Sequence, residues 1–174
     1  MIERLNRLAE DLDNLKGEII MADTNNTQAQ QQPPEPYPGL KSLDRLVGRW
    51  KVSGPDIHGQ VTFEWMDGGF FLVQHVDLEH GGRKIKGIEI IGYDRGFGAT
   101  EPSKNMKSHW FGNTGDTFDY TYEVDDDTLT IWGGEKGSPA YYKGKWSDNG
   151  NTNTGAWVYP DGGYESTMTR VKSK

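Results

Sequence analysis

The segment that decides the fold spans residues 61–93 and reads VTFEWMDGGFFLVQHVDLEHGGRKIKGIEIIGY. Two turn signals, Asp67-Gly68 and Gly81-Gly82, divide it into three stretches rich in β-branched and aromatic residues. Turns of this composition favour β-hairpins, because Gly and Asp accept the positive φ that type I′ and II′ turns require. The segment therefore predicts two consecutive hairpins whose pairing register is fixed by the turns.

The predicted register assigns side chains to the two faces of the sheet. The first turn pairs Phe63 with Leu72, and the second pairs Leu72 with Ile91. One face is then almost entirely apolar and is expected to point inward. It carries Val61, Phe63, Trp65, Phe70, Leu72, Val76, Leu78, Ile85, Ile91 and Tyr93. The same register forces Gln74 and Glu89 onto this interior face, side by side.

Further turn signals extend the pattern toward the C-terminus: Asp125-Asp126, Asn149-Gly150 and Asp161-Gly162. They predict the pairs Tyr122–Leu129, Trp146–Asn153, Tyr142–Trp157 and Trp157–Ser166. The side chains expected inside are Phe118, Tyr120, Tyr122, Tyr142, Trp146, Trp157, Met168 and Arg170.

The segment before residue 112 allows two orientations. A four-residue loop over 112–115 would place His109 inside. A five-residue loop would instead place Met106, Ser108 and Trp110 inside, and we favour it because it buries Trp and Met and leaves Lys107 outside.

The whole pattern predicts an all-β fold of ten strands after a short helix or turn at Gly39–Val47. The strands are expected at about 48–53, 59–66, 69–79, 84–93, 104–111, 117–124, 128–132, 140–147, 152–159 and 164–171. Ten short antiparallel strands form a meander, and closing it into a barrel removes the exposed edges.

Two segments precede the predicted barrel of residues 40–174. Residues 1–21 show apolar side chains at spacings of three and four, which predicts an amphipathic helix. Residues 22–39 are rich in Gln and Pro and are expected to form a linker.

Composition limits the function. The net charge of −7 argues against binding to nucleic acid or to an anionic membrane surface. The sequence has no Cys, and its four His show no spacing typical of a metal site, so neither a metal nor a cofactor is expected. With no signal-peptide pattern and no membrane-spanning apolar stretch, we expect a cytoplasmic protein.

Several motifs resemble those of known barrels. Gly48-Arg49-Trp50 is similar to the Gly-x-Trp of the lipocalins and the wider calycin group, and Arg170 matches the late-strand Arg that packs across the Trp there. Together with the Trp65–Phe71 turn and the closing residues Gly155, Trp157, Gly162, Gly163, Tyr164, Met168 and Arg170, residues 40–172 resemble a bacterial family of uncharacterised lipocalin-like barrels, the DUF1579 type. The resemblance implies a calycin-like barrel and no established activity.

The Gln74–Glu89 pair is the sharpest candidate site. A carboxylate on an apolar interior face has a raised pKa unless it is paired, and general bases are made in this way. Glu89 could anchor a ligand or transfer a proton; alternatively, it is a structural carboxylate paired with Gln74, Arg170 or a tyrosine. Arg170 could bind a ligand carboxylate or close the barrel against Trp50.

The aromatic interior allows two interpretations as well. Its rings and hydroxyls suit a flat, partly polar organic ligand, or they fill the barrel without a cavity. The candidate ligand-binding residues are Trp65, Gln74, Glu89, Tyr93, Tyr120, Tyr122, Tyr142, Trp157 and Arg170.

An outward-facing apolar patch of Phe71, Val73, Ile88 and Ile90 is also predicted. Such a patch is expected to be covered, either by the N-terminal helix or by a second copy of the chain in a homo-oligomer.

Three functions follow from this sequence. The first is a barrel that binds a small hydrophobic or amphipathic molecule. The second is a cavity enzyme, such as an isomerase or cyclase, with Glu89 as base. The third is a non-catalytic interaction protein with a filled barrel.

Overall fold

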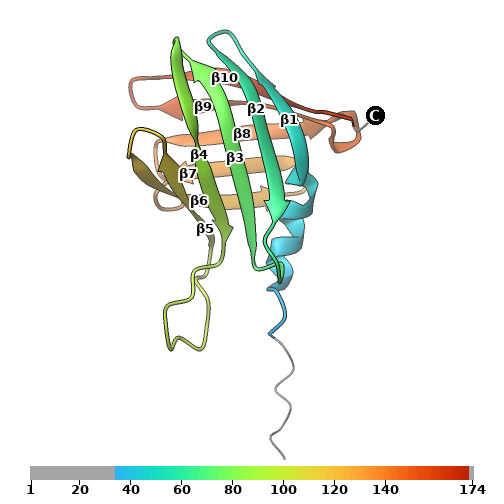
Figure 1. Cartoon of the computed structure of the whole chain (residues 1–174), viewed down its shortest axis with the longest axis vertical. Helices are drawn as coiled ribbons and strands as arrows, with labels where there is room; N and C mark the ends of the chain where they lie inside the picture. The colour runs from blue at the N-terminus through green and yellow to red at the C-terminus, as the bar shows by residue number, and fades with distance from the viewer. Residues whose placement is uncertain (1–33, 173–174) are drawn as a thin grey trace, which may run out of the picture. The chain divides into compact units, whose positions relative to one another are not determined.

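The computed structural model describes residues 34–172, which form a closed barrel of ten antiparallel strands (Figure 1). The 3₁₀ helix η1 (Pro38–Leu46) leads into the first strand. The strands are β1 (Gly48–Ser53), β2 (Ile57–Trp65), β3 (Phe71–His80), β4 (Arg83–Gly92), β5 (Met106–Gly112), β6 (Thr117–Asp125), β7 (Thr128–Gly133), β8 (Tyr141–Ser147), β9 (Thr152–Tyr159) and β10 (Gly162–Arg170). A second short 3₁₀ helix, η2 (Asp148–Gly150), joins β8 to β9. The amphipathic helix predicted over residues 1–21, and most of the predicted linker, lie outside the described residues.

The topology is the predicted meander. Each strand pairs with its neighbour in the sequence, and β1 closes the barrel on β10 through pairs such as Trp50 with Arg170. The prediction of an all-β, ten-stranded closed barrel is confirmed.

Two of the turns set the predicted register. Gly81 and Gly82, both with positive φ, form the two-residue turn that pairs Gln74 with Glu89 and Leu72 with Ile91. The β8–β9 connection pairs Tyr142 with Trp157 as predicted. The two polar side chains on the inner face are therefore neighbours across β3 and β4.

Three predicted registers were wrong by two residues. Trp65 pairs with Leu72 rather than Phe70, Tyr122 with Ile131 rather than Leu129, and Trp157 with Tyr164 rather than Ser166. A shift of two leaves every side chain on its predicted face, because side chains along a strand alternate with a period of two. The predicted set of inward-facing strand residues is therefore correct despite the register error.

Each shift has a local cause. Gly68 and Gly69 both have positive φ, so the β2–β3 loop is longer than a two-residue turn, and half-buried Phe70 belongs to the loop. Asp126, at φ 43°, moves the β6–β7 turn one residue onward. Pro160 has no N–H to donate to a ladder, so it occupies the β9–β10 turn with Asp161.

The β5–β6 loop has the five-residue length that we favoured, since Phe111 pairs with Thr117. Met106, Ser108 and Trp110 are buried inside. His109 lies on the outer face between Asp119 and Asp94, at 2.8 Å and 3.0 Å from its ring nitrogens.

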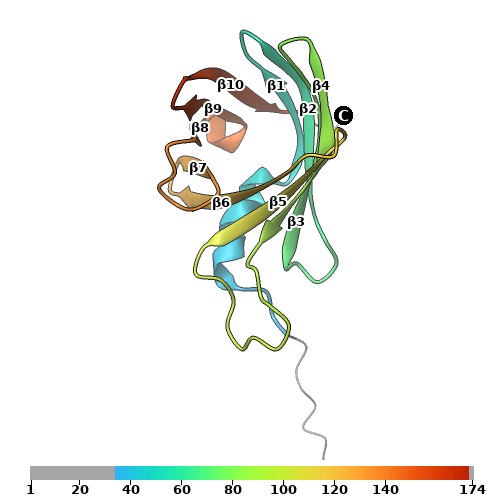
Figure 2. The ribbon, with the colours of Figure 1, turned by 90° about the vertical axis from the view of Figure 1, so that its left-hand side faces the viewer.

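One end of the barrel is covered by η1, which leads into β1 (Figure 2). Leu40, Leu43 and Leu46 of η1 are buried in the core. Trp50 is fully buried, and its Nε1 donates a hydrogen bond of 2.6 Å to the Leu46 carbonyl. The Arg170 guanidinium lies 4.1 Å from the Trp50 ring centroid, so strand β10 seals the same end.

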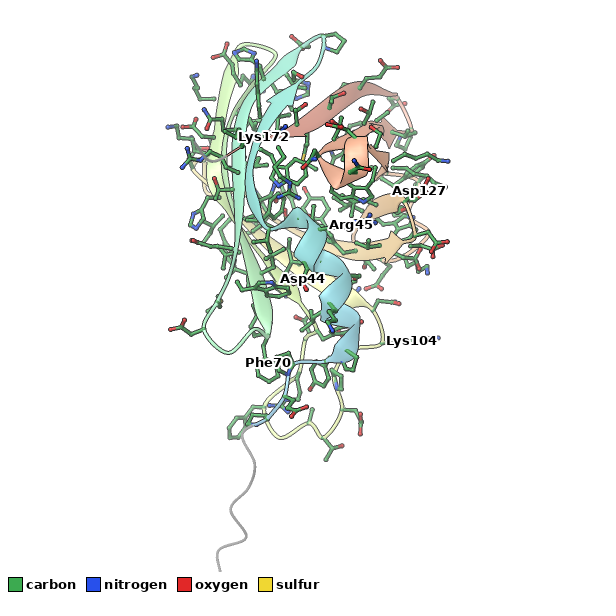
Figure 3. The ribbon with its side chains drawn as sticks, turned by 90° about the vertical axis from the view of Figure 1, so that its right-hand side faces the viewer. Asp44, Arg45, Phe70, Lys104, Asp127 and Lys172 are labelled. Atoms are coloured by element: carbon green, nitrogen blue, oxygen red, sulfur yellow. The ribbon has the colours of Figure 1, made fainter. Side chains whose placement is uncertain are left out.

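Arg170 also fixes the chain that follows η1. Its guanidinium donates to the carbonyls of Val47 and Arg45, the latter at 2.7 Å. Arg45 in turn donates to the Asp126 carbonyl, and Asp44 accepts a hydrogen bond of 2.9 Å from Trp65 (Figure 3 labels Asp44 and Arg45 on η1). Of the two interpretations of Arg170, the structure shows the closing contact with Trp50.

The outer apolar patch of Phe71, Val73, Ile88 and Ile90 lies on the outer face of β3 and β4 as predicted, and Phe111 extends it opposite Ile88. Ile88 is 38% exposed and Phe111 47% exposed. That a second copy covers this patch stays a prediction.

No helix among residues 34–172 has both the length and the apolar character needed to cross a membrane.

Candidate functional site

The barrel encloses a cavity of about 610 Å³. Its inner part lies next to the η1 core and is apolar, with Leu46, Val61, Phe63 and Leu129 in the wall. The barrel interior therefore contains open space, although large aromatic side chains occupy much of it.

The cavity opens at the end opposite η1, where the β3–β4, β5–β6 and β9–β10 turns lie. Arg83 and Lys84 line it from the first of these turns, and Asp116 from the second. Phe118 and Tyr159 are 52% and 41% exposed there. This mouth carries several charged side chains of the cavity lining, whereas the inner part carries one, Glu89.

Glu89 is held on the inner wall by two hydroxyl groups. Its Oε1 accepts a hydrogen bond of 2.5 Å from Ser108 Oγ and another of 3.0 Å from the Tyr122 hydroxyl. Glu89 is only 6% exposed. Within residues 34–172, Oε2 has no hydrogen-bond partner, and no Lys, Arg or His forms an ion pair with the carboxyl group.

Burial dominates the electrostatics of this group. It raises the pKa of Glu89 above its ordinary value, against the opposing effect of the hydrogen bonds from Ser108 and Tyr122. Burial and the nearby Glu89 charge also raise the pKa values of Tyr122 and Tyr120. Both tyrosines therefore stay neutral at physiological pH, and the weakly acidic carboxyl group of Glu89 accepts a hydrogen bond from one neutral phenol, Tyr122.

A continuous aromatic wall faces the cavity from β6, β8 and β9. The Trp157 ring centroid lies 5.9 Å from that of Tyr120 and 5.7 Å from that of Tyr142, and the ring stacks on Tyr159 at 6.0 Å. The Tyr142 hydroxyl donates a hydrogen bond of 2.6 Å to Asn153, and burial raises the pKa of Tyr142 to about 12. The rings offer a flat apolar surface with polar edges.

Two glycines make room for these side chains. A Cβ at Gly87 would lie 2.5 Å from the Trp110 ring, and one at Gly144 would lie 2.4 Å from the Tyr142 hydroxyl oxygen. Trp110 fills the space over Gly87 and donates a hydrogen bond of 2.8 Å to Asp116, which ties the β5–β6 loop to the wall.

Six of the nine predicted site residues line the cavity: Gln74, Glu89, Tyr120, Tyr122, Tyr142 and Trp157. The other three lie near η1, outside the cavity lining. Trp65 donates to Asp44, Tyr93 packs edge-on against Tyr37 at 5.6 Å between centroids, and Arg170 covers Trp50. The alternation of side chains along a strand predicts which residues face inward. It does not predict how far along the barrel axis a residue lies, and that position decides whether the side chain lines the cavity or packs at the closed end near η1.

The sequence analysis placed Ser108 inside but did not name it as a site residue. The β4–β5 register sets Glu89 opposite Trp110 and Ile91 opposite Ser108, so Ser108 is a diagonal neighbour of Glu89 on the same face. The five-residue loop that buries Trp110 was the signal that could have identified this hydrogen bond.

Among residues 34–172, no group of three or more His, Asp and Glu side chains is arranged to hold a metal ion. The fold and the cavity together define a closed β-barrel with a pocket open at one end. No family model matches the chain, and no curated protein is detectably similar to it in sequence.

Proposed function

We propose that this protein binds a small hydrophobic or amphipathic organic molecule inside its barrel. The observation that carries the proposal is the cavity of about 610 Å³, open at one end, whose wall includes Glu89 with one carboxyl oxygen that has no partner among residues 34–172. Ligand pockets in proteins have volumes of roughly 300–1,000 Å³ and mostly apolar walls with a few polar groups.

The energetic argument supports a ligand. Apolar wall atoms around a void lose dispersion contacts. That loss is recovered when a molecule with an apolar body occupies the cavity, and Glu89 Oε2, which faces no hydrogen-bond donor among residues 34–172, can accept a hydrogen bond from a polar group of that molecule. The aromatic wall of Tyr120, Tyr142 and Trp157 would contact the body, and Glu89 and Gln74 the polar group.

We also propose that the barrel belongs with the lipocalin-like barrels of the DUF1579 type. The packing of Arg170 across buried Trp50, two residues after Gly48, supports this assignment. This contact lies at the closed end of the barrel, and the resemblance adds nothing about the ligand.

A second candidate function uses the same cavity for acid–base catalysis. It is favoured by the raised pKa of Glu89 together with a phenol, Tyr122, within hydrogen-bonding distance. In such an enzyme Glu89 would abstract a proton and a tyrosine would donate one. Glu89→Gln would then abolish turnover, whereas in a binding protein it changes affinity alone.

The binding function is tested by titration with the neutral fluorescent probe N-phenyl-1-naphthylamine. We expect one saturable site per chain, with affinity weakened about tenfold or more in Trp157→Ala, since that change removes the centre of the aromatic wall. Trp132→Ala is the matched control, because Trp132 lies on the outer face beneath Lys136. Absence of binding, or equal loss in both variants, would contradict the proposal.

A further inference from the structure

The inner cavity holds a carboxyl group, that of Glu89, away from the charged side chains at the mouth. Glu89 is 6% exposed, and no cationic side chain among residues 34–172 pairs with it. The charged cavity-lining groups other than Glu89 are at the mouth: Arg83, Lys84 and Asp116, with His80 as a further titratable group. Buried carboxylates in proteins are paired with a cation, hydrogen-bonded or neutral; Glu89 has its two hydrogen bonds at Oε1, and a cation could bind at Oε2.

We propose that the ligand is an organic ammonium, a protonated amine on an apolar or aromatic body, whose N–H groups bind Glu89 Oε2. The inference rests on the proposed binding function and specifies its ligand class. The ammonium would pair with the carboxylate, and the apolar body would fill the rest of the cavity.

The hydrogen bonds to Glu89 favour its charged form. Ser108 and Tyr122 both donate to Oε1, which stabilises a carboxylate and leaves Oε2 free. Gln74, opposite Glu89 in the register and also in the cavity wall, brings an amide oxygen as a second acceptor.

The aromatic wall suits a cation as well. Ammonium groups are attracted to the faces of Trp and Tyr rings, and the attraction is stronger where water is excluded. Tyr120 connects this wall to the carboxyl group, because its ring neighbours Trp157 and its pKa is raised in part by the Glu89 charge. A cation near Glu89 therefore lies near an aromatic ring too.

Among the groups that face the ligand site, Glu89 is the one whose ionisation should control how binding depends on pH. Gln74 faces it from β3, Ser108 and Trp110 from β5, and Tyr120 and Tyr122 from β6. The tyrosines stay neutral at physiological pH. Because the carboxyl group must be ionised in the complex, binding an ammonium releases a proton wherever free Glu89 is protonated, and affinity then rises with pH.

The inference is tested by isothermal titration calorimetry with three probes that share one ring system: tryptamine, tryptophol and indole-3-propionate. They are cationic, neutral and anionic. For the wild-type protein we expect tryptamine to bind about tenfold or more tightly than the other two, with proton release that differs between buffers of different ionisation enthalpy.

Glu89→Gln is the decisive variant, since it keeps the shape of the side chain and removes its charge. We expect it to lose the preference for tryptamine and its pH dependence while tryptophol affinity changes about threefold at most. If this variant did not fold, Tyr122→Phe, which removes one donor to Oε1, is expected to weaken tryptamine binding more than tryptophol binding.

The outcomes separate the two proposals. If N-phenyl-1-naphthylamine binds but tryptophol or indole-3-propionate equals or exceeds tryptamine, the ligand is not an ammonium and the binding function stands. Tryptamine binding unchanged in Glu89→Gln would overturn the inference as well. If neither the naphthylamine nor any indole binds, the binding function itself fails.

Discussion

The Tyr122 hydroxyl on β6 donates a hydrogen bond of 3.0 Å to Glu89 on β4, across the intervening strand β5. Ser108 on that intervening strand donates to the same oxygen. Side chains of three adjacent strands thus meet at one carboxyl group in the inner part of the cavity. Packing alone would not require two hydroxyl groups to donate to the same carboxyl oxygen.

The first consequence is a pH-dependent stability. Because burial raises the pKa of Glu89 in the folded state, the folded protein binds more protons than the unfolded chain above the ordinary pKa, and stability falls as pH rises through this window. Glu89→Gln should remove this loss. We expect a gain of about 1–3 kcal/mol in unfolding free energy near pH 8 and a smaller difference near pH 5, from urea denaturation.

The control for that experiment is Glu79→Gln, since Glu79 lies outside the cavity lining and pairs with Lys84 at 2.9 Å. It should show no gain at high pH. A difference between wild type and Glu89→Gln that stayed constant from pH 5 to pH 8 would contradict the assignment of a raised pKa to Glu89.

The Tyr122 hydroxyl should stabilise the charged form of Glu89. Tyr122→Phe leaves the carboxylate with Ser108 as its one remaining donor, so the pKa of Glu89 should rise further, and unfolding free energy near pH 8 should fall by about 1–2 kcal/mol. A carbon-13 titration of the Glu89 carboxyl group measures the first effect. Tyr120→Phe is the matched control, because the Tyr120 hydroxyl has no hydrogen-bond partner within residues 34–172; an equal effect of both variants would count against this role.

Arg170 should stabilise the closed end of the barrel rather than the cavity. Arg170→Lys keeps the charge but loses the planar stacking on Trp50 and the forked contact with two carbonyls, so unfolding free energy should fall by about 1–3 kcal/mol. Binding of N-phenyl-1-naphthylamine by the folded variant should be unchanged. Arg49→Lys, on the exposed face of β1, should have little effect on either quantity. Loss of probe binding in folded Arg170→Lys would show instead that Arg170 serves the cavity.

The position of Trp110 depends on Gly87. In Gly87→Ala, the new Cβ would meet the Trp110 ring at 2.5 Å and the Phe111 carbonyl oxygen at 2.3 Å. We expect a loss of about 1–3 kcal/mol in unfolding free energy and a shift in tryptophan fluorescence. Gly96→Ala is the control, since nothing lies within 4 Å of a Cβ there. Equal stability of the two variants would mean that Trp110 can move at no cost.

The sequence predicted the faces of the strands more reliably than their registers. The turns after Trp65, Asp125 and Tyr159 were each misplaced so that pairing slipped by two residues, yet Tyr120 and Tyr122 still point inward. A register error of two residues does not change which side chains share a face, so the alternating pattern cannot detect it. Only the backbone conformation at Gly69, Asp126 and Pro160 distinguishes the alternative registers.

The height of each residue within the barrel could not be predicted in the same way. Trp65 and Glu89 share the inward face, but Trp65 reaches the η1 end and binds Asp44, whereas Glu89 lies in the cavity wall. Height depends on strand tilt and on how η1 docks, and both are set by contacts between residues far apart in the sequence.

The central claim is that the barrel holds a small organic molecule. Native mass spectrometry of the protein purified from its own host, followed by denaturing extraction and analysis of released small molecules, tests it most directly. We predict an added mass that is retained in Trp132→Ala, lost in Trp157→Ala and, if the ligand is an ammonium, reduced in Glu89→Gln. A protein without any bound molecule, which also fails to bind N-phenyl-1-naphthylamine or the indole probes, would contradict the account.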